Sequence, residues 1–232
     1  MRTWIFVFAL IMTVAGFAGK AAAGSQTYGF DSGYWGFNGD AGYSTWFSIE
    51  NSDGQPAPCL RIKGMSGFGL EVTRPGLVGD FAAAGYGRVR LDLKILSWFP
   101  PSSMPSPVPR IFLQRSNDHS PWVKVVNGFS PVLGQWQQIY VDFNPAWTDA
   151  QAQTAGWQVE PFGLPNAAFQ ETCRSVFASG VWLKIPGAPA ESYFLVDNYT
   201  LLPPGSSPHK LKPFGPHRKT LTITPKSTSE GK

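Results

Sequence analysis

The feature that most constrains this chain is a two-residue alternation of apolar and polar side chains. In the segment GRVRLDLKILSW, the apolar residues Val89, Leu91, Leu93 and Ile95 alternate with Arg88, Arg90, Asp92 and Lys94. The segments QQIYVDFN at 137–144 and GVWLKIPG at 180–187 repeat the pattern. Because successive side chains of a β-strand point to opposite faces, this period predicts strands with one buried face.

Other short segments read in the same way. They predict strands at 28–31, 44–50, 59–63, 70–73, 110–115, 122–126 and 192–202, separated by Gly, Pro, Asn and Asp. Many short strands joined by turns predict an all-β fold, an antiparallel jelly-roll β-sandwich. One segment differs: LPNAAFQETCRSVFAS at 164–179 places Phe169, Cys173, Val176 and Phe177 at helical spacing. We expect one short helix there, capped by Asn166.

The chain divides into three parts. Residues 1–23 combine Arg2, an apolar core and small residues up to Ala23, which is typical of a cleaved export signal. That apolar core is too short for a transmembrane anchor, so we expect a secreted, periplasmic or cell-surface protein. Residues 24–202 form the predicted sandwich domain, and residues 203–232 form a proline-rich basic tail that we expect to be disordered.

The formal charge of +4 is unevenly distributed. Residues 24–202 carry 11 Lys and Arg against 14 Asp and Glu, whereas residues 203–232 carry six against one. A nucleic-acid-binding domain concentrates basic residues on its folded body, so we expect no nucleic-acid partner. The tail is suited either to weak, salt-sensitive contact with anionic surfaces or merely to keeping the protein soluble.

The folded part offers little catalytic chemistry. His119 is its one histidine, which excludes a zinc site built on several histidines and forces any Ser-His-Asp triad through that residue. No G-x-S-x-G or H-E-x-x-H motif is present. We therefore expect no enzyme, although a glycosidase needs only two suitably spaced carboxylates. The two cysteines, Cys59 and Cys173, form either a disulfide or two buried free thiols.

An acidic residue, Asp197, interrupts the apolar segment SYFLVDNYTLL at 192–202. On a regular strand it would share a face with Leu195 and Tyr199. An unpaired carboxylate is costly in such a place, so a cation, backbone amides or an arginine must compensate it.

Three segments carry a family resemblance: FLVDNYTL, YGFDSGYWGFNGD and GQWQQIYVDF. Together they resemble galactose-binding-like jelly rolls, the group that includes many carbohydrate-binding modules. Within this group, LVGDFAAAGYGRVRLDLKI and AAFQETCRSVFASGVWLKIPG are similar to the laminin B (laminin IV type A) module. The resemblance covers most of residues 28–202.

The resemblance implies that the first and last strands lie side by side, with a structural Ca²⁺ where they meet. The matching positions are Asp31 and Asp197, with Asp40 as a third candidate. Calcium prefers oxygen ligands from carboxylates, amides and carbonyls.

Outward-facing side chains suggest a binding surface. If their strands are neighbours, Trp182 and Tyr140 are aromatic platforms for sugar rings and Arg90, Gln138 and Lys184 are hydrogen-bond donors. Trp98, which opens a proline-rich loop, is a separate candidate, and Trp182 could equally pack beneath a loop.

We therefore predict an exported, non-catalytic module that recognises carbohydrate or extracellular matrix. A laminin-B-like protein–protein adhesion module and a divergent polysaccharide-active enzyme are the alternatives.

Overall fold

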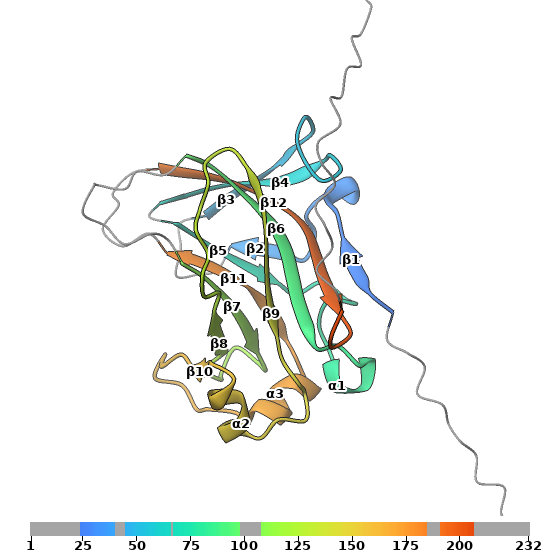
Figure 1. The fold of residues 1–232 in the computed structure, drawn as a ribbon, viewed down its shortest axis with the longest axis vertical. Coiled ribbons are helices and arrows are strands. Elements are labelled where there is room, and N and C mark those ends of the chain that lie inside the picture. Colours follow the sequence, from blue (N-terminus) through green and yellow to red (C-terminus); the bar gives the residue numbers. More distant parts are fainter. Residues whose placement is uncertain (1–23, 40–44, 66, 98–107, 185–190, 207–232) are drawn as a thin grey trace, which may run out of the picture.

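A computed structural model describes residues 24–39, 45–65, 67–97, 108–184 and 191–206 of the protein. Two antiparallel sheets of six strands each pack face to face (Figure 1). The all-β antiparallel sandwich predicted from the alternation is confirmed. The predicted export signal at 1–23, Asp40, Trp98 and residues 207–232 lie outside the described residues, and the tail contact with anionic surfaces stays a prediction.

The first sheet, sheet A, has the strand order β3-β4-β12-β6-β9, and β1 also pairs with β12. Its strands are β1 (Gln26–Tyr28), β3 (Thr45–Glu50), β4 (Cys59–Met65), β6 (Arg88–Ser97), β9 (Trp136–Asp142) and β12 (Glu191–Leu202). The strand β9 therefore forms one edge of sheet A.

The second sheet, sheet B, has the order β10-β8-β7-β11-β5-β2. Its strands are β2 (Phe37–Gly39), β5 (Gly67–Val72), β7 (Val108–Gln114), β8 (Trp122–Val125), β10 (Trp157–Val159) and β11 (Ala178–Lys184). Short helices complete the fold: η1 (Phe30–Ser32), α1 (Phe81–Ala84), α2 (Asp149–Thr154) and α3 (Phe169–Arg174). In the described residues no helix has the length and apolar character needed to cross a bilayer.

The core lies between the two sheets, where the alternating apolar residues meet. The inward residues of β6 are at most 1% exposed, namely Val89, Leu91, Leu93 and Ile95. Aromatic pairs connect the two sheets; for example, Phe68 of β5 and Phe194 of β12 have ring centroids 4.8 Å apart. The alternation thus determines which face of each strand is buried.

The two ends of the folded body meet as neighbouring strands. Gln26 pairs with Leu201 and Tyr28 pairs with Tyr199, and Figure 1 shows β1 beside the end of β12. The first-to-last strand pairing implied by the jelly-roll resemblance is therefore confirmed, although β1 ends at Tyr28 and the next residues form η1.

The last strand contains a bulge beside Asp197. Asp197 lies opposite Asp92 and Thr200 lies opposite Arg90. The chain therefore advances three residues on β12 for two on β6, which leaves one extra residue on β12. Asn198 takes a positive φ of 50° at this point. Tyr199 turns into the core and its hydroxyl contacts Ser179 Oγ at 2.7 Å. The prediction that Asp197 and Tyr199 share a face is wrong, because an extra residue reverses the alternation.

The short helix predicted within 164–179 is present as α3, but it ends at Arg174, so Val176 and Phe177 lie outside it. Its cap differs from the prediction: the N-cap residue is Ala168, and no side chain caps the helix. Cys173 lies on α3 and Cys59 lies on β4, and both are buried free thiols rather than a disulfide. Burial raises the pKa of each thiol to about 12, so neither is a reactive thiolate at neutral pH.

Candidate functional site

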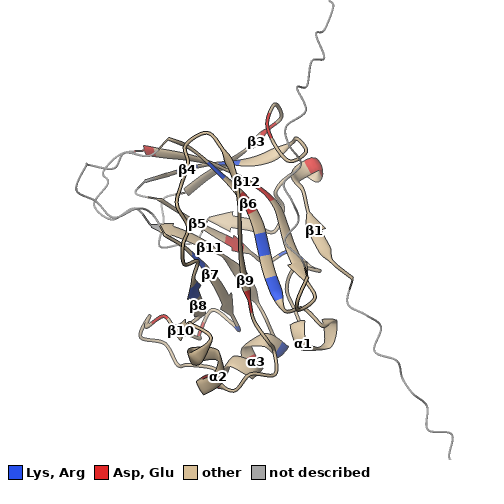
Figure 2. Cartoon of the chain, in the orientation of Figure 1, with Lys and Arg blue, Asp and Glu red and all other residues tan. Residues whose placement is uncertain are grey.

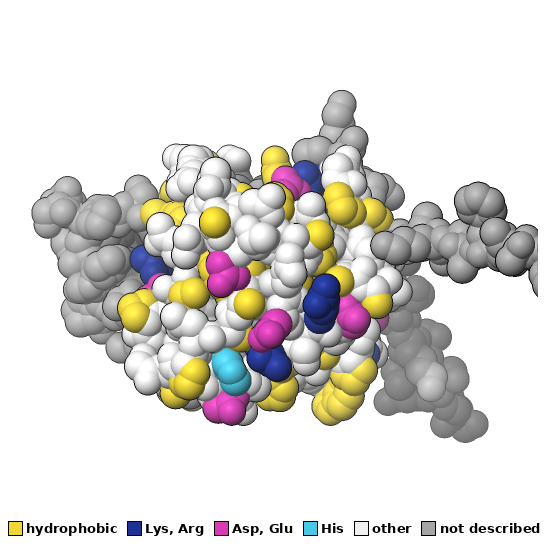
Figure 3. Space-filling view, turned by 90° about the horizontal axis from the view of Figure 1, so that it is seen from below, with side chains coloured by type: hydrophobic (Ala, Val, Ile, Leu, Met, Phe, Trp, Pro, Cys, Tyr) yellow, Lys and Arg dark blue, Asp and Glu magenta, His cyan; other side chains and the backbone are white. Residues whose placement is uncertain are grey.

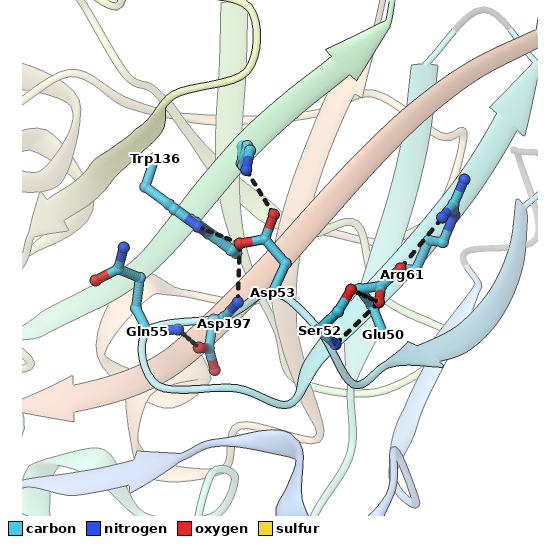
Figure 4. Close-up of polar contacts among 9 residues, drawn as sticks. Glu50, Ser52, Asp53, Gln55, Arg61, Trp136 and Asp197 are labelled. Atoms are coloured by element: carbon cyan, nitrogen blue, oxygen red, sulfur yellow. Dashed lines mark hydrogen bonds and ion pairs between the residues drawn. The ribbon is translucent and has the colours of Figure 1, made fainter. Parts of the chain in front are cut away.

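The loop 51–58 between β3 and β4 lies across the outer face of sheet A (Figure 4). Asp53 attaches it to two strands, because its carboxylate accepts hydrogen bonds from Lys94 Nζ at 2.5 Å and from Trp136 Nε1 at 3.0 Å. The loop is therefore held over β6 and β9 by side chains of opposite charge and by an indole.

The same loop covers Asp197, which is fully buried. The backbone N–H of Gln55 donates to Asp197 Oδ2 at 2.5 Å, and the N–H of Asn198 donates to Oδ1 at 2.8 Å. The amide of Asn198 donates to Gln55 O at 2.6 Å and to Asp92 Oδ2 at 2.9 Å. Backbone amides thus satisfy part of the hydrogen-bonding capacity of Asp197, as one of the predicted alternatives required.

The surroundings of Asp197 are nevertheless unfavourable for a negative charge. Burial raises its pKa to about 7, the two N–H donors oppose this rise, and the charges of Asp92 and Asp31 add to it. A methyl group placed on Gly29 would lie 3.8 Å from Asp197 Oδ1 and 3.9 Å from Asp31 Oδ2. The two aspartates predicted to share a cation thus face one point of the structure.

The chemistry of these groups suits calcium, because the carboxylate oxygens face a shared point and no ion pair joins Asp197 to a cationic side chain of the described residues. The described residues contain no group of three or more His, Cys, Asp or Glu side chains able to hold a metal ion. A calcium ion bound by Asp31 and Asp197 would therefore need backbone carbonyls or water to complete its ligands.

The outer face of sheet B carries an aromatic cluster. The rings of Trp182 on β11 and Phe112 on β7 are stacked, with centroids 4.6 Å apart and planes at 21°. Phe162, in the loop after β10, lies 5.7 Å from Trp182 and is 55% exposed, whereas Trp182 is only 6% exposed. The cluster therefore has a buried base and one ring that reaches solvent.

Polar groups flank this cluster. Trp182 lies directly opposite Arg110 on β7 and opposite Gly69 on β5. Arg110 Nη1 lies 3.3 Å from Glu160 Oε2, and both side chains are partly exposed. Exposed aromatic area beside a charged hydrogen-bonding pair is the combination that small-ligand sites use for orientation.

The predicted ligand-binding residues do not form a single surface. Trp182 and the backbone of Lys184 lie on sheet B, whereas Arg90, Gln138 and Tyr140 lie on the outer face of sheet A. The patch required neighbouring strands, and these strands belong to different sheets. Alternation alone shows which side chains share a face of one strand but not which strands are neighbours.

The sheet A residues of that set are buried or already contact neighbouring side chains, although Nε and Nη1 of Arg90 have no hydrogen-bond partner in the described part of the chain. Arg90 is 5% exposed and donates to Thr200 Oγ1 at 3.1 Å, so it is not a surface donor. Gln138 donates to Asp92 at 3.3 Å. Tyr140 is 38% exposed, and the Arg88 guanidinium lies over its ring at 4.5 Å. Figure 2 shows the basic bands along β6.

Sequence reasoning missed Phe112, Phe162 and the loop 51–58. Phe112 had a usable signal, because it alternates with the core residues Ile111 and Leu113 and so must face outward. Phe162 had none, since its position depends on how the loop after β10 folds over β11.

The histidine does not form a triad. Ser116 Oγ and Asp118 Oδ1 both lie 2.7 Å from the same ring nitrogen, Nδ1 of His119. A triad requires the serine and the acid on opposite ring nitrogens.

On the end of the molecule seen in Figure 3, acidic and basic side chains are interspersed with apolar ones.

Comparisons with known proteins agree with the architecture. No family model matches the chain, and no curated protein matches its sequence. The family 11 carbohydrate-binding module of the cellulase Lic26A-Cel5E of Clostridium thermocellum is 14% identical, with a TM-score of 0.50 over 79% of this chain and 96% of that one. The Clostridium thermocellum family 11 module in complex with a β-1,3-1,4-mixed-linked tetrasaccharide gives a TM-score of 0.51 at 14% identity, over 79% and 98%.

An exo-β-agarase also matches, at 11% identity and a TM-score of 0.51, over 80% of this chain and 26% of the agarase chain. These likenesses show that the chain has the jelly-roll fold of carbohydrate-binding modules.

Proposed function

We propose that this protein is an exported, non-catalytic carbohydrate-binding module whose sugar platform is the aromatic cluster on the outer face of sheet B. The observation that carries the proposal is the stacked pair of Trp182 and Phe112 with the solvent-exposed Phe162 against it. The fold shared with the family 11 modules supports it.

The physical reason lies in the chemistry of sugars. A pyranose ring has an apolar C–H face and a rim of hydroxyl groups, so it needs an aromatic surface beside hydrogen-bonding groups. Phe162 provides exposed aromatic area, and the Arg110–Glu160 pair lies beside the same cluster. The aromatic cluster and its flanking Arg110–Glu160 pair contain no nucleophile beside a base, so binding accounts for this surface better than turnover does.

The experiment is retention of the folded protein on a panel of immobilised neutral polysaccharides. Phe162→Ala should reduce retention on the bound glycan about tenfold, the effect of losing about 1.4 kcal/mol of contact. Phe177→Ala is the matched control, because Phe177 is 41% exposed and lies outside the cluster. Equal retention of the two variants would contradict the proposal.

Failure of the wild-type protein to bind any polysaccharide would favour the alternative, a laminin-B-like module that binds proteins. Release of reducing ends or unsaturated sugars would favour the divergent polysaccharide-active enzyme. Each outcome selects a different class of protein.

We also propose that a structural Ca²⁺ binds at Asp31 and Asp197, beneath the loop 51–58. The burial of Asp197 and the facing carboxylate of Asp31 support this. Calcium should raise the melting temperature over that in chelator by about 5 °C or more, because a ligand that binds only the folded state stabilises it. Asp31→Asn should abolish the shift. A wild-type melting temperature that ignores both calcium and chelator would contradict the proposal.

A further inference from the structure

A second feature, separate from the aromatic cluster, is a groove at one edge of the sandwich. It encloses about 460 Å³ between β8, the loop after it, and the edge strand β9. Its lining includes Lys124, Asn127, Ser130, Gln138, Tyr140 and Asp142. The volume lies within the range of small-molecule sites.

Lys124 is the unusual member of this lining. On β8 it alternates with Val123 and Val125 and therefore points to the same side as the core residue Trp122. It lies opposite Trp157, whose indole donates to Asp142 O on β9 at 3.1 Å. The lysine thus extends between the two sheets, where the core ends and the groove begins.

The ammonium of Lys124 has neither an ion pair nor a hydrogen bond within the described part of the chain. Burial lowers the pKa of Lys124, and the charge of Asp142 opposes this effect. The carboxylate of Asp142 is paired with another cation, since Arg88 donates hydrogen bonds to both of its oxygens at 2.6 and 3.0 Å. Because Arg88 and Asp142 neutralise each other, the groove retains one uncompensated positive charge.

The backbone of β9 adds hydrogen-bonding groups to the groove. The N–H of Phe143 donates to Gly87 O. In the antiparallel register, the backbone N–H and C=O groups of every second residue before Phe143, at 141, 139 and 137, therefore point toward β6. The N–H and C=O groups of Gln138 and Tyr140 therefore point to the free edge of the strand. Gln137 fixes the opposite wall, donating to Ser130 O and accepting from Val132 N–H, both at 2.8 Å.

We propose that this groove binds a hexuronate residue of an acidic polysaccharide, with the sugar carboxylate on the Lys124 ammonium and its hydroxyls on the β9 edge. A carboxylate supplies the charge that the groove lacks, and hydroxyl groups both donate and accept, as the exposed backbone edge requires. The site is independent of the neutral-sugar platform on sheet B, so either can fail alone.

The test is retention of the full chain on immobilised polygalacturonate and alginate. Lys124→Met should reduce retention on these acidic polymers about tenfold, because a charge-assisted hydrogen bond is lost. Its melting temperature should equal or exceed that of the wild type, since the substitution removes a partly buried charge without a partner.

Lys63→Met is the matched control. It removes the same charge from the outer side of sheet A, where Lys63 Nζ pairs with Glu191 at 2.5 Å, and it should leave retention unchanged. Phe162→Ala should also leave acidic-polymer retention unchanged. Equal losses in the two lysine variants, a Lys124→Met variant that binds like the wild type, or no wild-type retention on either polymer would overturn the proposal.

Discussion

Asp197→Asn is expected to remove a fall in stability that the wild-type protein shows as pH rises from about 4 to about 7. Burial and the neighbouring acids raise the folded-state pKa of Asp197 from its ordinary value of 3.8 to about 7. The folded protein therefore holds this proton more tightly than the unfolded chain does. The stabilisation is complete below about pH 4 and is lost as pH rises through about 7.

The expected size is large for one residue. The rise in the pKa of Asp197 corresponds to a change in the free energy of unfolding of at most about 4 kcal/mol. The charged groups facing Asp197 are Asp31 on η1 and Asp92 on β6, and both oppose its ionisation. Hydrogen bonds from Gln55 and Asn198 reduce the penalty without removing it.

Urea unfolding between pH 4.5 and 8, in chelator, measures the effect. The wild-type free energy of unfolding should decline over this range, while that of Asp197→Asn should stay level. Asp118→Asn is the control. Asp118 is exposed, and hydrogen bonds with Ser116 and His119 lower its pKa, so its titration changes stability only at pH values below this range. Parallel pH profiles for wild type and Asp197→Asn would show that the buried carboxylate does not govern this range.

Gly180→Ala is expected to weaken both the fold and glycan binding. A Cβ on Gly180 would lie 1.9 Å from Leu70 O and 2.7 Å from the Phe112 ring. Both neighbours are in sheet B, and the ring is the one stacked on Trp182. Overpacking of this kind costs about 1–3 kcal/mol, and displacement of the ring disturbs the sugar platform.

Denaturant unfolding and glycan retention test this second prediction together. Gly24→Ala is the control, because a Cβ at Gly24 would meet nothing within 4 Å. A Gly180→Ala variant with unchanged stability would show that Phe112 does not pack closely on Gly180.

Much of the fold was predictable because its main strands alternate strictly. The apolar residues Val89, Leu91, Leu93, Ile95, Ile139 and Val141 are buried as the period requires. The opposite face of β6 is buried too, contrary to the expected single buried face, since Arg88, Arg90 and Asp92 are at most 7% exposed. The strands β2 and β10, at three residues each, are too short to show a period. The helices α1 and α2 were not predicted, although each begins at a residue type typical of N-caps, Asp80 and Thr148.

The candidate site was harder to predict, for two physical reasons. The bulge at Asn198 changes which residues face the core after Asp197, and a local backbone irregularity leaves no periodic signal. The placement of β6 and β11 in different sheets depends on long-range pairing, which a strand's own residues do not encode. The pairing of β1 with β12 follows the resemblance, and it brings Asp31 of η1 near Asp197; the calcium site assigned to the two residues stays a prediction.

The proposed function requires that neutral glycan binds the outer face of sheet B. This is tested by recording the NMR chemical shifts of the backbone amides and the tryptophan indole N–H groups while the folded protein is titrated with an oligosaccharide of the retained glycan. The largest shift changes should fall on Trp182, Phe112 and the loop residues around Phe162, with sheet A nearly unaffected. Changes centred instead on the outer face of sheet A, around Tyr140 and Gln138, would contradict the claim.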